Sequence, residues 1–166
     1  MASKKGIIIT IVILVAITAG SFLFWLIPQD SPMSLVISDH ENYLDGVKEI
    51  HSILDETIST EFENLKDEKI SPDEYIQIAD VTSSQITSKV SEFVTSKPTE
   101  EWQDSYINYM DAMKKFNEHI VETEVLANLI ENEGTEKEMA ETLEKIESLK
   151  AESIEHAKIS DELRPD

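Results

Sequence analysis

The hydrophobic residues of this chain follow two patterns. Residues 7–27 (IIITIVILVAITAGSFLFWLI) are 21 consecutive residues without a charged side chain. From residue 38 onward the apolar residues recur every three or four positions, which is the repeat of one face of an α-helix. The first pattern predicts a helix that spans a membrane, and the second predicts a set of amphipathic helices.

The predicted membrane segment has the length and flanking charges of a single-pass anchor. A helix over 7–27 is about 30 Å long, which matches the hydrocarbon core of a bilayer. Lys4 and Lys5 precede it and Asp30 follows it, which favours an N-terminus in the cytoplasm and a C-terminal domain outside. In the cell membrane we therefore expect a cytoplasmic N-terminus at 1–6, a transmembrane anchor at 7–27 and a hinge at 28–37.

Three other interpretations of this segment are less favoured. A cleaved signal peptide has an apolar core of about 7–15 residues, whereas here large apolar side chains continue after the small residues 19–21. Lys4-Lys5-Gly6 resembles the processing site of type IV pilin-like precursors, which implies cleavage after the glycine, but Ile11 stands where bacterial pilins carry a glutamate. The third interpretation is that residues 7–27 form a buried helix of a soluble protein. A retained anchor is the preferred interpretation.

Four amphipathic helices are predicted downstream, at about 38–66, 72–97, 100–132 and 136–161. Two of them follow a capping box, at 71–74 (SPDE) and 135–138 (TEKE), while Pro98 and Gly134 are expected to end the second and third helices. Lys150 and Ser153 interrupt the fourth apolar stripe, which is the weakest. The stripes expected to form the core are Leu44, Val47, His51, Leu54, Ile58, Phe62 and Leu65; Tyr75, Ala79, Thr82, Ile86, Val90 and Phe93; Trp102, Tyr106, Tyr109, Met113, Phe116, Ile120, Thr123, Ala127 and Ile130; and Met139, Leu143, Ile146, Ile154 and Ala157.

Short loops between helices of similar length make consecutive helices antiparallel neighbours. The sequence therefore predicts an all-α fold, in which a single N-terminal transmembrane helix is followed by an elongated, coiled-coil-like, up-down-up-down four-helix bundle over 38–166. The alternative is a long two-helix hairpin that dimerises as a coiled coil, because several stripes approach heptad spacing.

Composition narrows the function classes. The 34 acidic and 14 basic residues give a formal charge of −20, so the chain would repel the phosphates of a nucleic acid. The absence of cysteine excludes disulfides, cysteine-ligated zinc and a cysteine nucleophile. A calcium-binding loop of the D-x-[DN]-x-[DN]-G type is also absent from the sequence. We expect no enzymatic activity and no cofactor.

The four histidines are the main candidates for metal chemistry. None has a glutamate three residues before it, which excludes the Glu-x-x-His pairs of a ferritin-like di-iron bundle. His40, Glu152 and His156 are the only candidate metal ligands, because the first and last helices of such a bundle are neighbours. A solvated or capping role is the favoured interpretation of the two histidines. His51 and His119 lie on apolar stripes and are expected to be core residues.

The aromatic and methionine residues at the start of the third helix are the candidates for partner binding. Tyr, Trp and Met are enriched at protein interfaces, so Trp102, Tyr106, Met110 and Met113 could line a partner groove. Three of these four share one stripe with Phe116, which favours a core role instead. Met110 falls off that stripe.

These features predict a membrane-anchored, non-enzymatic extracytoplasmic protein, an accessory or structural subunit. Its expected partners are the lipid bilayer, through 7–27, and another membrane or envelope protein, or a second copy of itself. The alternative is a small-ligand-binding ectodomain of a sensor type, which would act through a partner chain because only 1–6 are expected in the cytoplasm. A metal or haem carrier is a minor alternative.

Overall fold

The computed structural model describes residues 37–165, which lie within a compact unit at Leu35–Asp166. Its elements are α2 (His40–Lys66), α3 (Pro72–Thr95), the single 3-10 turn η1 (Glu100–Trp102), α4 (Gln103–Glu131) and α5 (Glu136–Glu162). The predicted anchor at 7–27 lies outside the described residues. None of the helices within 37–165 is long and apolar enough to cross a membrane.

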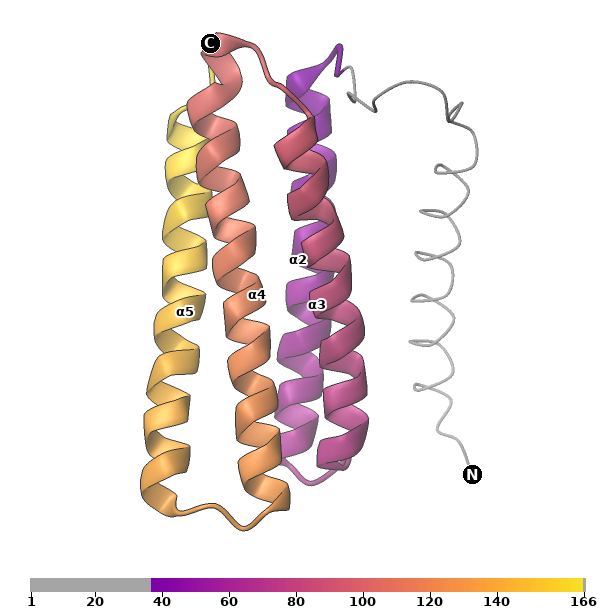
Figure 1. Cartoon of the computed structure of the whole chain (residues 1–166), viewed down its shortest axis with the longest axis vertical. Coiled ribbons are helices and arrows are strands. Elements are labelled where there is room, and N and C mark those ends of the chain that lie inside the picture. The colour runs from indigo at the N-terminus through magenta and orange to yellow at the C-terminus, as the bar shows by residue number, and fades with distance from the viewer. Residues whose placement is uncertain (1–36, 166) are drawn as a thin grey trace. The chain divides into compact units, whose positions relative to one another are not determined.

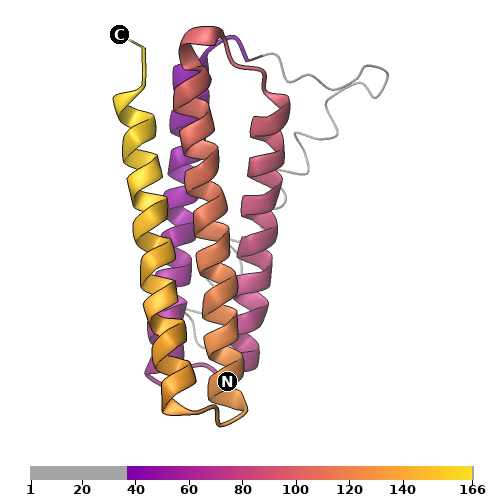
Figure 2. The same ribbon diagram turned by 60° about the vertical axis from the view of Figure 1, so that its left-hand side comes forward.

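The four helices run alternately up and down, which confirms the predicted all-α, up-down four-helix bundle (Figure 1). α2 packs against α3, α3 against α4, and α4 against α5, and α4 also contacts α2 across the bundle. The backbones of α2 and α5 stay farther apart than those of the other neighbours. As Figure 2 shows from a second side, the start of α2, the loop after α3 and the end of α5 lie at one end of the bundle.

Side-chain caps start three of the four helices, and two of these caps are the predicted capping boxes. Ser71 and Glu74 form the capping box of α3, and Thr135 and Glu138 form that of α5. Asp39 caps α2 by accepting a hydrogen bond from the backbone N–H of Asn42 (3.0 Å). Each cap satisfies backbone donors that the first helical turn leaves free.

The end of α4 differs from the expected glycine stop. The residue in the left-handed conformation is Glu133 (φ 53°), and the φ of Gly134 is not positive. The N–H of Gly134 donates to the carbonyl of Leu129 (2.8 Å), which closes the helix. A Cβ at Gly134 would lie 2.8 Å from the Leu129 side chain, so the glycine serves this close approach and not an unusual φ.

The core is built from the predicted stripes of α2, α3 and α4. Their members are mostly buried. The exceptions are His51, Phe62, Val90 and Trp102, which are half-buried, and Ile130, which is exposed. The buried apolar cluster consists of Leu44, Val47, Leu54, Ile58, Leu65, Tyr75, Ala79, Ile86, Phe93, Tyr106, Tyr109, Ala112, Met113, Phe116, Ile120 and Ala127.

The predicted stripe of α5 is largely wrong. Leu143 and Ile154 are exposed (38% and 61%), and of the predicted residues only Ile146 is buried. Ser153, which we expected to interrupt the stripe, is buried because its hydroxyl donates to the carbonyl of Ala112 in α4 (2.9 Å). A bonded hydroxyl escapes most of the desolvation penalty of burial. The buried residues of α5 are Thr142, Ile146, Leu149, Ser153 and Ser160, spaced by three, four or seven positions.

Two isoleucines of α5 test this assignment by the same substitution. Ile146→Ala should lower the free energy of unfolding by about 2–5 kcal/mol, because it leaves a cavity in the core. Ile154→Ala should change it by less than about 0.5 kcal/mol, because that side chain is 61% exposed. The measurement is urea unfolding of the full chain in mild detergent, followed by circular dichroism. Equal losses in the two variants would contradict the observed burial.

Candidate interaction surface

His40 lies in the first turn of α2, at the aromatic end of the bundle. Its ring packs against Trp102 and Tyr106, with ring centroids 6.2 and 5.8 Å away. The Tyr106 hydroxyl donates to the carbonyl oxygen of His40 (2.9 Å). His40 is therefore packed into the end of the bundle by aromatic contacts.

The other two candidate metal ligands, Glu152 and His156, lie on α5. Glu152 pairs with Lys115 of α4 (3.0 Å), and the hydrogen bond from that ammonium lowers the pKa of Glu152. His156 is half-buried and its Nδ1 has no hydrogen-bond partner.

The register between α2 and α5 separates His40 from His156. Lys48 pairs with Asp161 and Ser59 with Lys150, so eleven residues along α2 correspond to eleven residues back along α5. His156 is then level with residue 53, which is 13 residues from His40, or about 20 Å along the helix. Among residues 37–165 no group of three histidine, aspartate or glutamate side chains is placed to hold a metal ion.

The aromatic and methionine candidates belong to the core. Tyr106 and Met113 are 2% and 0% exposed, and Trp102 and Met110 are half-buried against the same apolar cluster. Tyr106 also packs against Phe93, with ring centroids 5.0 Å apart. These four residues do not form an exposed groove, and their aromatic stripe joins α4 to α2 and α3.

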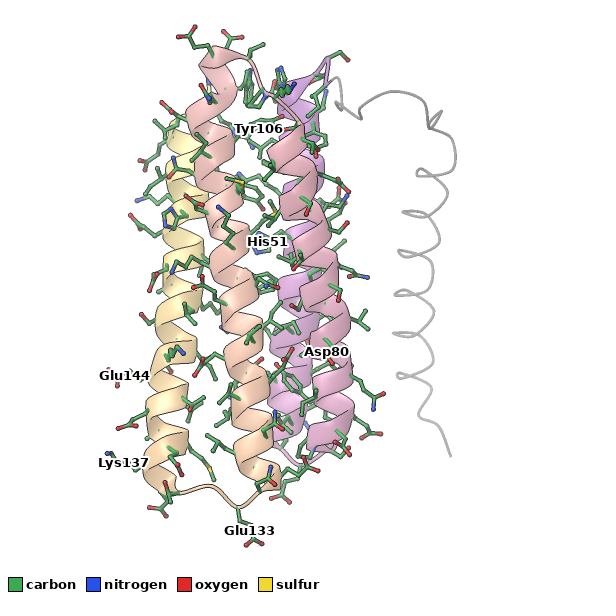
Figure 3. The ribbon with its side chains drawn as sticks, viewed as in Figure 1. His51, Asp80, Tyr106, Glu133, Lys137 and Glu144 are labelled. Carbon is green, nitrogen blue, oxygen red and sulfur yellow. The ribbon has the colours of Figure 1, made fainter. Side chains whose placement is uncertain are left out.

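Two histidines lie inside the bundle, as their stripes predict. His51 shares a hydrogen bond with the Tyr109 hydroxyl (Nδ1 to Oη, 2.9 Å) and packs against Phe116 at 4.6 Å, and Figure 3 shows it between the helices. Burial lowers the pKa of His51 to about 4, although nearby Asp55 opposes the shift. His119 is 4% exposed and its Nδ1 lies 3.0 Å from the Ile146 carbonyl oxygen. Burial lowers its pKa as well.

Small hydroxyl residues line the contact between α4 and α5. Ser105 donates to the carbonyl of Ser160 (2.8 Å), and Ser153 bonds to α4 as described above. Such short side chains let the two backbones approach closely, and each hydroxyl is used in the packing. The sequence carries a signal for this contact, because hydroxyl residues recur at heptad spacing on α5. In the sequence, however, these residues look like a break in an apolar stripe.

The surface beside the α2–α3 contact carries two stripes without a charged side chain, one on each helix. Both stripes have the spacing 4, 3, 4, 3, 4. Thr57 and Asn64 are half-buried and the other ten residues are exposed. We call this surface the uncharged face. It consists of Gly46, Ile50, Ile53, Thr57, Thr60 and Asn64 on α2, and of Gln77, Val81, Ser84, Ser88, Ser91 and Thr95 on α3.

Contacts with the other helices show that the two stripes flank the same seam. On α2, Lys48, Asp55 and Ser59 reach α5, so the α2 stripe lies on the opposite flank, toward α3. On α3, Ser83 hydrogen-bonds to Asn117 of α4 (2.8 Å), and the α3 stripe lies opposite the buried residues of that helix, so it faces outward. Both stripes therefore face outward beside the α2–α3 contact, and the paired Lys89 and Glu92 of α3 lie between them.

Charge elsewhere on the bundle contrasts with this face. α5 carries nine acidic and four basic residues, and the labelled Glu144 and Lys137 of α5 point outward in Figure 3. α3 carries four acidic residues and one lysine, and Val81–Ser88 contains none of them. Of the charged residues near the seam, Lys89 and Glu92 pair with each other (2.8 Å) and Glu61 is 95% buried. The uncharged face thus contrasts with the acidic surface of α5.

Comparison of the chain with known proteins identifies no similar protein. The chain matches no protein-family model, no curated protein and no solved structure. Its function is therefore inferred from the geometry and charge described above.

Acid should destabilise the bundle through His51. An unfolded histidine takes up a proton near pH 6.5 and the folded His51 only near pH 4, so stability is lost as the pH falls through this window. The difference corresponds to about 3 kcal/mol. Between pH 7 and pH 4.5, His51→Gln should lose about 2–3 kcal/mol less free energy of unfolding than the wild type. Urea unfolding at both pH values measures this.

The carboxylates titrate in both proteins, so the difference between the two pH dependences isolates His51. Glu124 is one of them: burial and nearby Asp80 raise its pKa to about 6, which has the opposite effect on stability in this window. Titration of the His51 ring by NMR provides a direct check. A midpoint near pH 6.5 would contradict the burial of this ring.

Proposed function

We propose that this chain is a single-pass membrane protein whose bundle is a non-enzymatic, extracytoplasmic accessory or structural subunit. Residues 7–27 anchor it, and 1–6 lie in the cytoplasm. The bundle binds a partner chain of the same membrane or envelope through the uncharged face of α2 and α3. The observation that carries this proposal is the presence of this face on a chain of formal charge −20.

The composition of the face suits a protein contact. The buried centre of a protein interface is depleted in charged residues, because an unpaired charge loses its hydration there. Ile50, Ile53 and Val81 are 38%, 49% and 39% exposed, and covering their side chains releases about 25 cal/mol per Å² of apolar surface. The surrounding serine and threonine hydroxyls can donate and accept hydrogen bonds with a partner.

The contacts of the polar side chains inside the bundle support a structural role for this protein and not a catalytic one. The hydroxyls of Ser105 and Ser153 donate to main-chain carbonyls between α4 and α5. His51 and His119 contact a tyrosine hydroxyl and a main-chain carbonyl inside the bundle. Each of these groups is engaged in packing one helix against another.

Charge and the N-terminal sequence support the remaining parts of the proposal. A surface of this negative charge repels nucleic acids and anionic lipid headgroups, which leaves a protein as the favoured partner. The apolar run at 7–27, with Lys4 and Lys5 before it, favours an anchor with the bundle outside the cytoplasm.

A photo-reactive residue tests the proposed surface. Benzoylphenylalanine replaces Ile53 in the full chain, and a matched variant carries it at Ile154, an exposed isoleucine of α5. Irradiation of intact cells should give a discrete covalent adduct with a membrane or envelope chain from position 53 and not from position 154. Mass spectrometry of the adduct identifies the partner. Absence of an adduct at 53, or equal adducts at both positions, would reject the uncharged face as the binding surface.

Proteolysis of intact cells tests the proposed topology. Protease added to cells without their outer coat should cut the chain beyond Pro28 and leave the anchor in the membrane. Alkaline carbonate should fail to extract the uncut protein, because a transmembrane helix is held by the hydrocarbon core. Full protection from protease would reverse the orientation, and extraction by carbonate would refute the anchor.

A further inference from the structure

We propose that the partner on the uncharged face is a second copy of this chain, related to the first by a two-fold axis along the bundle. This inference rests on the proposed function, because it names the occupant of the same surface. Such an axis makes the two bundles parallel and sets α2 of each copy against α3 of the other.

Electrostatics favours a copy at this surface over other contacts between copies. Each chain carries a formal charge of −20, so two copies repel wherever acidic surfaces meet. The repulsion is smallest where both contact surfaces lack charged side chains. A cationic partner, in contrast, would gain most on an acidic surface such as that of α5.

The residues on the two stripes are complementary in size across such an axis. Tyr43 packs against Phe93 and Phe62 against Tyr75, which fixes the levels of α2 and α3 relative to each other. At these levels each of the two exposed isoleucines of the α2 stripe corresponds to a serine of the α3 stripe. A parallel two-fold contact therefore places Ile50 against Ser88 and Ile53 against Ser84 between copies, while Val81 meets Thr57, a side chain of similar size.

The alternating spacing of the stripes also suits helix–helix packing. Positions separated by three and four residues form the contact line of left-handed helix bundles, with helices crossing at about 20°. Gly46 belongs to this line, and a Cβ placed on it would meet no atom of the described residues within 4 Å beyond its chain neighbours and the backbone of its own helix. The stripe is thus open to a second molecule at that point.

The size of the face is sufficient for a specific dimer. Residues 46–64 span about 27 Å of helix, and two neighbouring helices present a width of about 20 Å. Each copy would then bury about 500 Å², or about 1,000 Å² in total, the lower limit of specific interfaces. Confinement of both anchors to one membrane raises their effective concentration and favours such a small interface.

Disulfide trapping tests the geometry of this contact. The chain has no cysteine, so two single variants, Ile53→Cys and Ser84→Cys, can be co-expressed with different tags in the full-length protein. Oxidation in native membranes should link the two tags, at least fivefold more than either variant links to itself. The control pairs Ile154→Cys with Ser84→Cys, and it should give only background linkage. Linkage equal to that of the control would overturn the proposal.

A charge substitution tests the energetics with a matched control. Ile53→Glu should raise the dimer dissociation constant at least tenfold in mild detergent, measured by analytical ultracentrifugation, because it brings two new charges into the contact. Ile154→Glu adds the same charge to α5 and should leave the constant within twofold. Equal helical content of the variants by circular dichroism excludes unfolding as the cause. A wild type that stays monomeric at 100 μM would overturn the proposal, as would equal weakening by both variants.

The adduct from position 53 separates this inference from the proposed function. An adduct of two copies supports both. An adduct with a different membrane protein overturns the second copy and leaves the proposed function standing. Failure to form any adduct overturns both.

Discussion

Burial of the α4 stripe is the interaction on which the rest of the bundle depends. α4 contacts each of the other helices, and it does so by different chemistry on each side. Toward α2 it offers aromatic rings and the Tyr109–His51 hydrogen bond. Toward α3 it offers the buried bond between Thr123 and Tyr75 (2.6 Å). Toward α5 it offers small hydroxyl residues and main-chain carbonyls, which hold a helix of few apolar residues.

These different kinds of packing explain why acidic residues are distributed unevenly among the helices. α5 needs little apolar surface to pack, so most of its positions are free to carry acidic side chains. α2 and α5 are joined mainly by ion pairs of long side chains, such as Lys150 with Asp55 (3.2 Å). α3 has few charges, and the charged residues that it carries near α2, Lys89 and Glu92, pair with each other. On an acidic bundle, a face with few charged side chains is a surface on which an equally acidic molecule can lie without strong repulsion.

Much of the fold was predictable because its signals are local. Spacing of three and four, two capping boxes and short loops are enough for four antiparallel helices. The stripe of α5 was not predictable in this way, since the burial of Ser153 depends on a carbonyl of another helix. The site residues illustrate the same limit: the adjacency of the first and last helices suggested that His40 and His156 could meet, but register separates them. The uncharged face was visible as two neutral heptad stripes, but only the register of α2 and α3 makes them one surface.

By itself the sequence determined the helices, their order, the core stripes of α2, α3 and α4 and the acidic character of the chain, because these depend on side chains within a few residues of each other. It also determined an apolar run at 7–27 long enough to span a bilayer. Only the tertiary structure decided which hydroxyl groups are buried, which histidines lie inside the bundle and which helix surfaces are neighbours. These properties depend on pairing between residues distant in the chain, and pairing is set by the packing of all four helices together.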